Sequence, residues 1–252
     1  MTARFFHTLP IRDAERIILN TDTSHHAVRV LRLKPGDFVT VFDGMGGEFS
    51  GRLEQISKSG CQVRIEHHLP IERESPLVIE LAQAICINEK MDWIIQKAVE
   101  QGAARIQPLI TSRTLVRLTG ERSDKREQHW QKIIIAACEQ CGRNQIPRLL
   151  PLMPLSHWLE QKLVWKHKNS NPAGHNIMLS PTAHQRLTEL SPPRAGEFIT
   201  LLTGPEGGFT GEEIDAAHLA GFIFVRLGSR ILRTESAALA AIAAAQTLWG
   251  DY

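Results

Sequence analysis

The chain has 252 residues, of which 42% are hydrophobic and 22% charged, and its formal net charge is +2. This is the composition of a globular protein long enough to bury a core, and it excludes collagen-like, disordered and disulfide-scaffold classes. The opening residues, MTARFFHTLP, lack the apolar core of a signal peptide, and the most apolar stretch, 237–245, is too short to span a bilayer. With only four cysteines as well, we expect a cytoplasmic protein with reduced thiols and no membrane contact.

Short β-like segments separated by turns fill the first seventy residues. Residues 38–42 alternate apolar and polar side chains, and 48–53 and 61–65 are further β-like runs, whereas only 27–33 has a helical period. A polar connection bounded by prolines follows Pro70, as is typical of a domain boundary. We therefore predict a small β-barrel domain over 1–72 and a second domain over 73–252.

Strands and helices alternate through the rest of the chain. Asn88 is placed to cap one helix, and Thr210 with Glu213 forms a capping box that begins another. This alternation predicts an α/β domain with a mostly parallel sheet. The expected strands are 77–86, 106–110, 176–179, 198–202 and 222–227, and the expected helices are 90–101, 125–141, 182–190, 211–221 and 234–249.

Positive charge is concentrated in one stretch of the second domain. Residues 105–148 carry nine basic and four acidic side chains, although the whole chain is close to neutral. Such a stretch attracts a polyanion such as RNA, but a solvated helical surface explains it equally well.

A glycine-rich loop, Thr203-Gly204-Pro205-Glu206-Gly207-Gly208-Phe209, follows one of the predicted buried strands. Its spacing is neither that of a dinucleotide fingerprint nor that of a phosphate-binding P-loop, so neither ligand class is favoured. Ligands of open α/β sheets bind at the carboxyl ends of strands, and glycines allow a backbone to lie against a ligand. A tight strand-to-helix turn is the alternative interpretation.

A second loop, residues 227–236, places two arginines beside the start of a helix. Thr234 is a natural cap and Glu235 suits the positive end of the helix dipole, but Arg230 and Arg233 lie where that dipole favours anions. Cations in this position suggest a bound anion or an RNA phosphate.

Several segments in chain order resemble the ribosomal RNA small subunit methyltransferase E family of the SPOUT methyltransferases. Residues 204–209 (GPEGGF) and 227–235 (LG, then ILRTE) are similar to its signature pair. Residues 26–37 resemble its N-terminal RNA-binding segment, 96–102 its first long helix, and 139–147 a further block. The likeness spans nearly the whole chain, which makes it more specific than either loop alone.

Two positions depart from the pattern of the family. Gln101 stands where leucine is expected and Ser236 where threonine is expected, and both changes are mild. The resemblance implies a C-terminal SPOUT domain with a deep trefoil knot, a PUA-like N-terminal barrel and a homodimer. It also implies methylation of ring nitrogen 3 of one uridine in the 16S rRNA of the small ribosomal subunit, with S-adenosylmethionine as cofactor and no metal.

The resemblance also suggests roles for individual residues. Arg233 would stabilise negative charge on the reacting base, and Glu206 is a candidate general base that could instead bind cofactor or orient an arginine. Candidates for RNA contacts are Arg4, Arg29, Arg32, Arg113, Arg143 and Arg230, although a surface salt bridge explains any one of them comparably well. Candidates for cofactor binding are Leu179, Leu202, Thr203, Gly204, Pro205, Glu206, Gly207, Leu227, Gly228, Ile231 and Leu232.

Other interpretations of the sequence remain open. The first is a SPOUT enzyme that acts on another RNA or another atom, and the second is a catalytically silent RNA-binding assembly factor. A hydrolase that binds phosphate is a more distant third. The pair Cys138 and Cys141 has the spacing of a zinc or redox site, but it lies on the apolar stripe of a predicted helix and has no second pair, which favours a buried, inert pair.

Overall fold

The computed structural model describes residues 2–57, 60–116, 120–168, 174–194 and 196–252. The chain forms two compact units, one of Met1–Glu74 with Ile135–Ile146 and one of Ser75–Ile134 with Pro147–Tyr252. The first boundary falls two residues after the expected one. The second segment of the N-terminal unit, residues 135–146, is not anticipated by the sequence.

The N-terminal unit is built on a five-stranded sheet in the order β1-β3-β4-β5-β2. Only β1 and β3 pair in parallel, and the remaining pairs are antiparallel. Alternate side chains such as Val39, Val41 and Val63 are buried in its core, as the period of a half-buried strand requires. The strands are β1 (Ala3–Phe6), β2 (Arg16–Ile18), β3 (Phe38–Phe42), β4 (Glu48–Ser57) and β5 (Gly60–Leu69).

Two short helical segments follow β2, namely α1 (Thr21–His25) and the π-helix η1 (His26–Val30). Asn20 caps the first of them, because its side chain accepts the amide hydrogen of Thr23. The helical stretch expected at 27–33 therefore begins and ends earlier than predicted.

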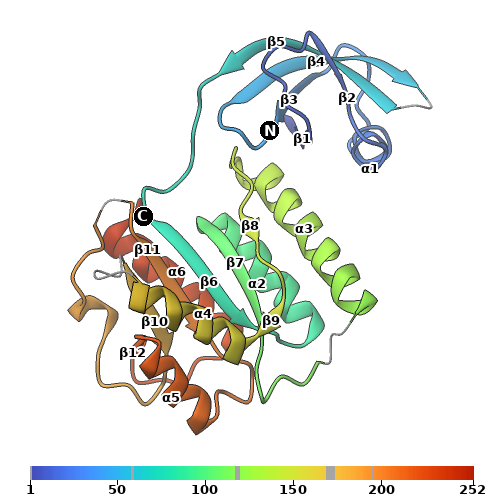
Figure 1. Ribbon diagram of the computed structural model, residues 1–252. Helices are drawn as coiled ribbons and strands as arrows, with labels where there is room; N and C mark the ends of the chain where they lie inside the picture. Colours follow the sequence, from blue (N-terminus) through green and yellow to red (C-terminus); the bar gives the residue numbers. More distant parts are fainter. Residues whose placement is uncertain (1, 58–59, 117–119, 169–173, 195) are drawn as a thin grey trace. The chain divides into compact units, whose positions relative to one another are not determined.

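The second unit contains a seven-stranded sheet in which every pair is parallel, so the predicted α/β class is confirmed (Figure 1). Its order is β12-β10-β11-β6-β7-β8, with β9 also pairing with β7. The strands are β6 (Val78–Ala84), β7 (Ala103–Ile110), β8 (Arg148–Leu149), β9 (Met153–Pro154), β10 (His175–Leu179), β11 (Phe198–Thr203) and β12 (Ile223–Val225).

Helices cover both faces of this sheet (Figure 1). One core cluster joins α2 and α6 to side chains such as Leu81 and Leu201, and the other joins α4 and α5 to their strand neighbours Ala82 and Leu202. Consecutive strand residues thus point to opposite faces. The helices are α2 (Asn88–Glu100), α3 (Glu121–Cys141), α4 (Leu155–Lys168), α5 (Gly211–Leu219), α6 (Thr234–Trp249) and the 3-10 helix η2 (Leu187–Glu189).

Two helix predictions need correction. A helix is expected over 182–190, but only η2 is helical there. The amide of Arg226 donates to the carbonyl of Gln185, and Arg186 forms a parallel bridge with Arg226. The sequence analysis also missed α4, in which Leu155, Trp158 and Leu159 are buried at helical spacing. None of the helices in the described part of the chain has the length and apolarity that a bilayer crossing requires.

Candidate functional site

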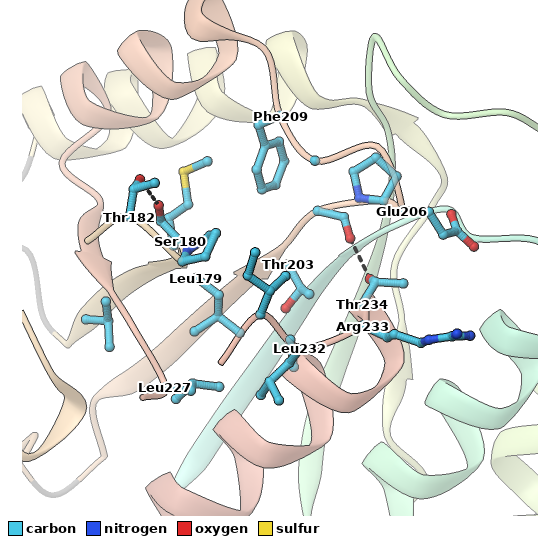
Figure 2. Close-up of a pocket in the computed structure, with 18 of the residues that line it drawn as sticks. Leu179, Ser180, Thr182, Thr203, Glu206, Phe209, Leu227, Leu232, Arg233 and Thr234 are labelled. Carbon is cyan, nitrogen blue, oxygen red and sulfur yellow. Dashed lines mark hydrogen bonds between the residues drawn. The ribbon is translucent and has the colours of Figure 1, made fainter. Parts of the chain in front are cut away.

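A pocket of about 580 Å³ lies at the carboxyl ends of three neighbouring strands of the second unit (Figure 2). The last residues of β10, β11 and β12, namely Leu179, Thr203 and Val225, all line it. The glycine loop, residues 203–209, and the arginine loop, residues 227–233, contribute most of the remaining wall. The structure therefore brings together the two loops that the sequence singled out.

Most of the predicted site residues line this pocket. Leu202 and Gly207 are exceptions: Leu202 is fully buried in the core against α4 and α5, and Gly207 faces Arg113. Sequence reasoning missed Lys90, which comes from the first turn of α2, and Phe209. The predicted residues that line the pocket are Leu179, Thr203, Gly204, Pro205, Glu206, Leu227, Gly228, Arg230, Ile231, Leu232 and Arg233.

The glycine loop is held by hydrogen bonds to its carbonyl groups. Inside the loop, the amide of Gly208 donates to the carbonyl of Pro205 at 2.9 Å. From outside, the hydroxyl of Thr234 donates to the carbonyl of Gly204 at 2.5 Å. The Nη1 of Arg113 donates to the carbonyls of Gly207 and Phe209 at 2.8 and 3.2 Å. The loop is therefore ordered by two separate parts of the chain.

The sequence predicts that Thr234 caps α6, but Thr234 is the first residue of the helix in the structure. The cap residue is Arg233, which makes no side-chain capping hydrogen bond. The buried Thr234 hydroxyl instead accepts a hydrogen bond from Nε2 of Gln83 at 3.1 Å while it donates to Gly204. Cys86 lies beside it at 3.7 Å, and burial raises the pKa of that thiol to about 11, so Cys86 stays neutral. This network joins the ends of β6 and β11 to the start of α6.

One side of the pocket is largely apolar and contains one unsatisfied hydroxyl. Figure 2 shows Leu179 and Leu227 opposite Glu206 and Arg233. Thr203 is only 2% exposed, and its Oγ1 makes no hydrogen bond in the described structure. An unpaired buried hydroxyl costs free energy, and this one belongs to a residue in the wall of the pocket.

The other side of the pocket is charged. Oε1 of Glu206 accepts hydrogen bonds from the amide of Ile87 at 3.3 Å and from Nζ of Lys90 at 3.2 Å, and Lys90 also lies 3.6 Å from Glu235. Burial alone would raise the pKa of Glu206. Hydrogen bonds from its own backbone amide, from the amide of Ile87 and from Lys90, together with the charge of Lys90, outweigh this effect and hold that pKa below its usual value. Glu206 is consequently a carboxylate at neutral pH.

The start of α2 explains part of this arrangement. The helix begins at Asn88 with Ile87 as its cap residue, so the expected cap at Asn88 is wrong. The amide of Ile87 is paired with Glu206, which comes from the glycine loop. An acidic group from far along the chain thus satisfies a helix N-terminus, and short-range sequence patterns do not reveal such a contact.

A side chain at each of two loop glycines would meet a different neighbour. A Cβ atom at Gly204 would lie 2.9 Å from Cε2 of the Phe209 ring, which itself lines the pocket. A Cβ atom at Gly207 would lie 3.2 Å from Cβ of Arg113. A side chain at 207 would therefore press on the stem of Arg113.

The six arginines proposed for RNA contacts fall into different environments. Arg230 is exposed at the pocket, and Arg29 and Arg32 are exposed in and just after η1. Arg4 and Arg143 are exceptions, because both form ion pairs within the N-terminal unit, Arg143 as a buried and Arg4 as a largely buried side chain. Arg117, part of the basic stretch, lies outside the described residues.

These two arginines hold the N-terminal unit together. Arg4 donates to Glu48 at 2.6 Å and to the carbonyl of Arg143 at 2.8 Å. Arg143 is 4% exposed and its Nε donates to both oxygens of Glu74 at 3.1 Å. Burial raises the pKa of Glu48, but Arg73 and Arg4 outweigh that effect and lower it. These contacts explain why residues 135–146 belong to this unit and give both arginines a structural role.

The cysteine pair is not bonded. Cys138 is buried and its pKa is raised to about 12 by burial, and Cys141 is partly exposed. Among the described residues, no cluster of three or more histidine, cysteine or acidic side chains could hold a metal ion.

Comparisons with known proteins match both units. Residues 73–246 match the RNA methyltransferase domain family, and residues 19–66 match the RNA methyltransferase PUA domain family. Ribosomal RNA small subunit methyltransferase E of Buchnera aphidicola (subsp. Acyrthosiphon pisum) is 34% identical, with 93% of this chain and 88% of the relative covered. The protein of the same name from Bacillus subtilis is 29% identical, with coverage of 93% and 91%.

Two solved structures are also similar to the chain over its whole length. The chain is similar to ribosomal RNA small subunit methyltransferase E of Neisseria gonorrhoeae bound to S-adenosyl methionine, with 37% identity and a TM-score of 0.89. It is also similar to a Legionella pneumophila protein solved with bound SAM, with 36% identity and a TM-score of 0.92. Each comparison covers 100% of both chains.

Proposed function

Because this chain belongs to the ribosomal RNA small subunit methyltransferase E family, we propose that it methylates ring nitrogen 3 of one uridine in 16S rRNA. The methyl donor in this proposal is S-adenosylmethionine. The observation that carries it is the pocket formed by the glycine and arginine loops, which has an apolar side, an unpaired buried hydroxyl and a charged side.

The apolar side of the pocket suits the adenosine part of the cofactor. Leu179, Leu227 and Leu232 offer apolar surface to a base. Thr203 lies in the same wall, and its hydroxyl has no hydrogen-bond partner among the described residues. Three loop carbonyls, those of Gly204, Gly207 and Phe209, are already paired within the protein. The loop therefore needs little reorganisation when a ligand binds, which favours affinity.

The charged side suits the reaction. S-adenosylmethionine supplies an electrophilic methyl group when bound. Loss of the imide proton leaves negative charge on the uracil ring, and Arg233 lies at the pocket where a cation would stabilise that charge. Glu206 is ionised and can accept a proton, but its low pKa makes it a weak base. Its ion pair with Lys90 supports a second role, in fixing the charged side of the pocket.

RNA would be held by exposed cations on both units. Arg29 and Arg32 are exposed on the unit that matches the PUA family, and Arg230 is exposed at the pocket. Such side chains are free to meet phosphates, whereas Arg4 and Arg143 are held in ion pairs. The substrate in this proposal is the rRNA of the small ribosomal subunit, and the enzyme is cytoplasmic.

The proposal includes a homodimer and a trefoil knot. Ile231 is 85% exposed although it is apolar and lines the pocket, which supports coverage of this loop by a second copy of the chain. The knot in this proposal rests on the membership of the family. The contact between Thr234, the first residue of α6, and Gly204 places the segment that follows the arginine loop beside the glycine loop.

The test is methyl transfer from labelled S-adenosylmethionine to small subunits isolated without the modification. A methyl group on ring nitrogen 3 blocks Watson–Crick pairing, so a reverse-transcription stop locates it. We expect one stop at a uridine of 16S rRNA. A modification at another atom or in another RNA would contradict the proposed target, and binding of rRNA without any transfer would favour a silent assembly factor.

A further inference from the structure

The side chain of Arg113 makes hydrogen bonds within the protein. It follows β7, outside the glycine loop, and its Nη1 reaches the carbonyl of Gly207 at 2.8 Å and that of Phe209 at 3.2 Å. Two carbonyls that are two residues apart therefore share one donor group. Sequence analysis assigned this arginine to RNA, but its contacts in the structure are with the loop that lines the pocket.

The backbone conformation of Gly207 gives a second, independent indication. Gly208 has a positive φ of 67°, which favours glycine, whereas Gly207 is not among the glycines with positive φ. What Gly207 meets is the side chain of Arg113, whose Cβ, Cδ and Cγ lie 3.2, 3.5 and 3.8 Å from a Cβ built at 207. The missing side chain at 207 thus provides the space in which Arg113 lies.

The segment that carries Arg113 is anchored as well. The amide of Ser112 donates to Oε1 of Glu213 at 2.8 Å, and the amide of Thr210 donates to Oε2 of the same carboxylate at 2.8 Å. Thr111 and Thr114 close a turn around it through a hydrogen bond of 2.9 Å between the Thr111 amide and the Thr114 hydroxyl. These hydrogen bonds hold the backbone on either side of Arg113, so its side chain extends from a fixed point beside the loop.

We propose that Arg113 is a positioning residue that holds the glycine loop in the shape that binds the methyl donor. This inference rests on the proposed function only for the identity of the ligand, since the loop contacts exist without it. A planar guanidinium suits this task, because the plane of the group fixes the directions of the two N–H bonds of Nη1, whereas the N–H bonds of a lysine ammonium rotate on a flexible stem.

The experiment compares Arg113→Met and Arg113→Lys with the wild-type chain. Methionine keeps an apolar stem beside Gly207 but removes the donors, and lysine keeps the charge. Hydrogen exchange of the peptide covering residues 204–210 reports the loop directly, and calorimetry with S-adenosylhomocysteine reports the pocket. Binding of unmodified 16S rRNA is measured in parallel.

Arg194→Met is the matched control. Arg194 is exposed and precedes the amino end of β11, whereas the glycine loop leaves the carboxyl end of that strand. This control removes one arginine from the same unit without touching the loop. Circular dichroism of all variants confirms that they fold.

We expect Arg113→Met to speed exchange of the loop peptide about tenfold and to weaken S-adenosylhomocysteine binding about three- to tenfold, the range expected for lost charge-assisted hydrogen bonds at an exposed site. Arg113→Lys should recover only part of both effects. Unchanged exchange in Arg113→Met, or a loss confined to RNA binding that lysine fully restores, would overturn the inference. If the wild-type chain bound no S-adenosylhomocysteine while exchange still rose, the positioning role would stand and the proposed function would fail.

Discussion

The two loops that form the pocket are built in opposite ways. The glycine loop is braced by hydrogen bonds from Arg113, Thr234 and its own Gly208, and its Glu206 is paired with Lys90. The arginine loop has exposed residues at 228–231, and in the described part of the chain the side chains of these residues make no hydrogen bond. One loop is ordered before any ligand arrives, and the other presents unpaired groups.

The difference between the two loops suits them to different kinds of contact. A braced loop holds its carbonyl and amide groups in place, so a ligand that binds there pays little ordering entropy. An exposed loop with Arg230 and Ile231 at its surface offers a cation and an apolar side chain to whatever covers the pocket. In the proposed function, the glycine loop is the preformed wall of the cofactor site, and the arginine loop adds Leu227 and Leu232 to that site while it presents Arg230 and Ile231 to rRNA and to a second copy. Substitutions in each loop should then have different signatures.

The largest expected effect follows substitution of Arg233→Gln in the arginine loop. Methyl transfer should fall about 100-fold, the scale of losing one electrostatic group that stabilises transition-state charge. The affinity for S-adenosylhomocysteine should remain nearly unchanged. Arg233 makes no side-chain capping hydrogen bond, so its replacement should leave α6 intact. Single-turnover methyl transfer and calorimetry measure the two quantities.

Arg230→Gln is the control for this prediction, since it removes a neighbouring charge from the same loop. We expect it to weaken rRNA binding and to leave the rate of the bound complex close to the wild-type rate. Equal losses in rate for the two variants would show that the loop contributes only general positive charge.

A smaller effect, on stability, should follow Thr234→Val beside the glycine loop. The substitution removes the hydroxyl that donates to the carbonyl of Gly204 and accepts from Gln83. The Gly204 carbonyl would lose this donor, whereas Nε2 of Gln83 would still donate to the carbonyl of Ala84. We expect a loss of about 1–3 kcal/mol in the free energy of unfolding. Urea unfolding measures it, and Thr234→Ser should restore most of the loss.

Thr247→Val provides the matched control in the same helix. Its hydroxyl donates to the carbonyl of Ala243 one turn earlier at the exposed surface. This substitution should change the free energy of unfolding by less than about 0.5 kcal/mol. A similar loss in both variants would mean that valine costs helix stability in general and that the contact with Gly204 contributes little.

Local sequence patterns predicted the parts of this molecule whose causes are local. The final helix was expected at 234–249 and observed at Thr234–Trp249, and the capping box of Thr210 and Glu213 is present as predicted. The strand at 38–42 also matches β3. In each case the period or the cap is contained in a few consecutive residues, so no distant contact needs to be known.

Local patterns do not reveal contacts whose partners come from distant parts of the chain. Lys90 was missed because its role depends on Glu206, which is 116 residues away. For Arg4 and Arg143 the sequence left RNA contacts and salt bridges both open, because nothing near them in sequence reveals Glu48 and Glu74 as their partners. The cofactor residues on both loops were found through a resemblance to a family, and their roles remain proposals.

The smallest expected effect concerns the ion pair that joins the glycine loop to α2. Glu206→Gln should lower the free energy of unfolding by about 0.5–1 kcal/mol at neutral pH, as is typical of a partly exposed pair. The pKa of Glu206 lies below its usual value of 4.5 in the native state. Its contribution is therefore present above pH 4.5 and is lost as the pH falls through the lower native pKa. Lys90 stays protonated throughout, because its pKa is raised by Glu206.

Urea unfolding of both chains at a series of pH values tests the sign. The difference in stability should shrink as the solution becomes more acidic, and Glu160→Gln, at an exposed position of α4, should show no such trend. A difference that persisted far below pH 4.5 would contradict an ion-pair origin, because a protonated Glu206 and a glutamine carry the same charge. Lys90→Met completes a double-mutant cycle with Glu206→Gln. The double variant should lose less free energy of unfolding than the sum of the losses in the two single variants, because each substitution removes the same contact.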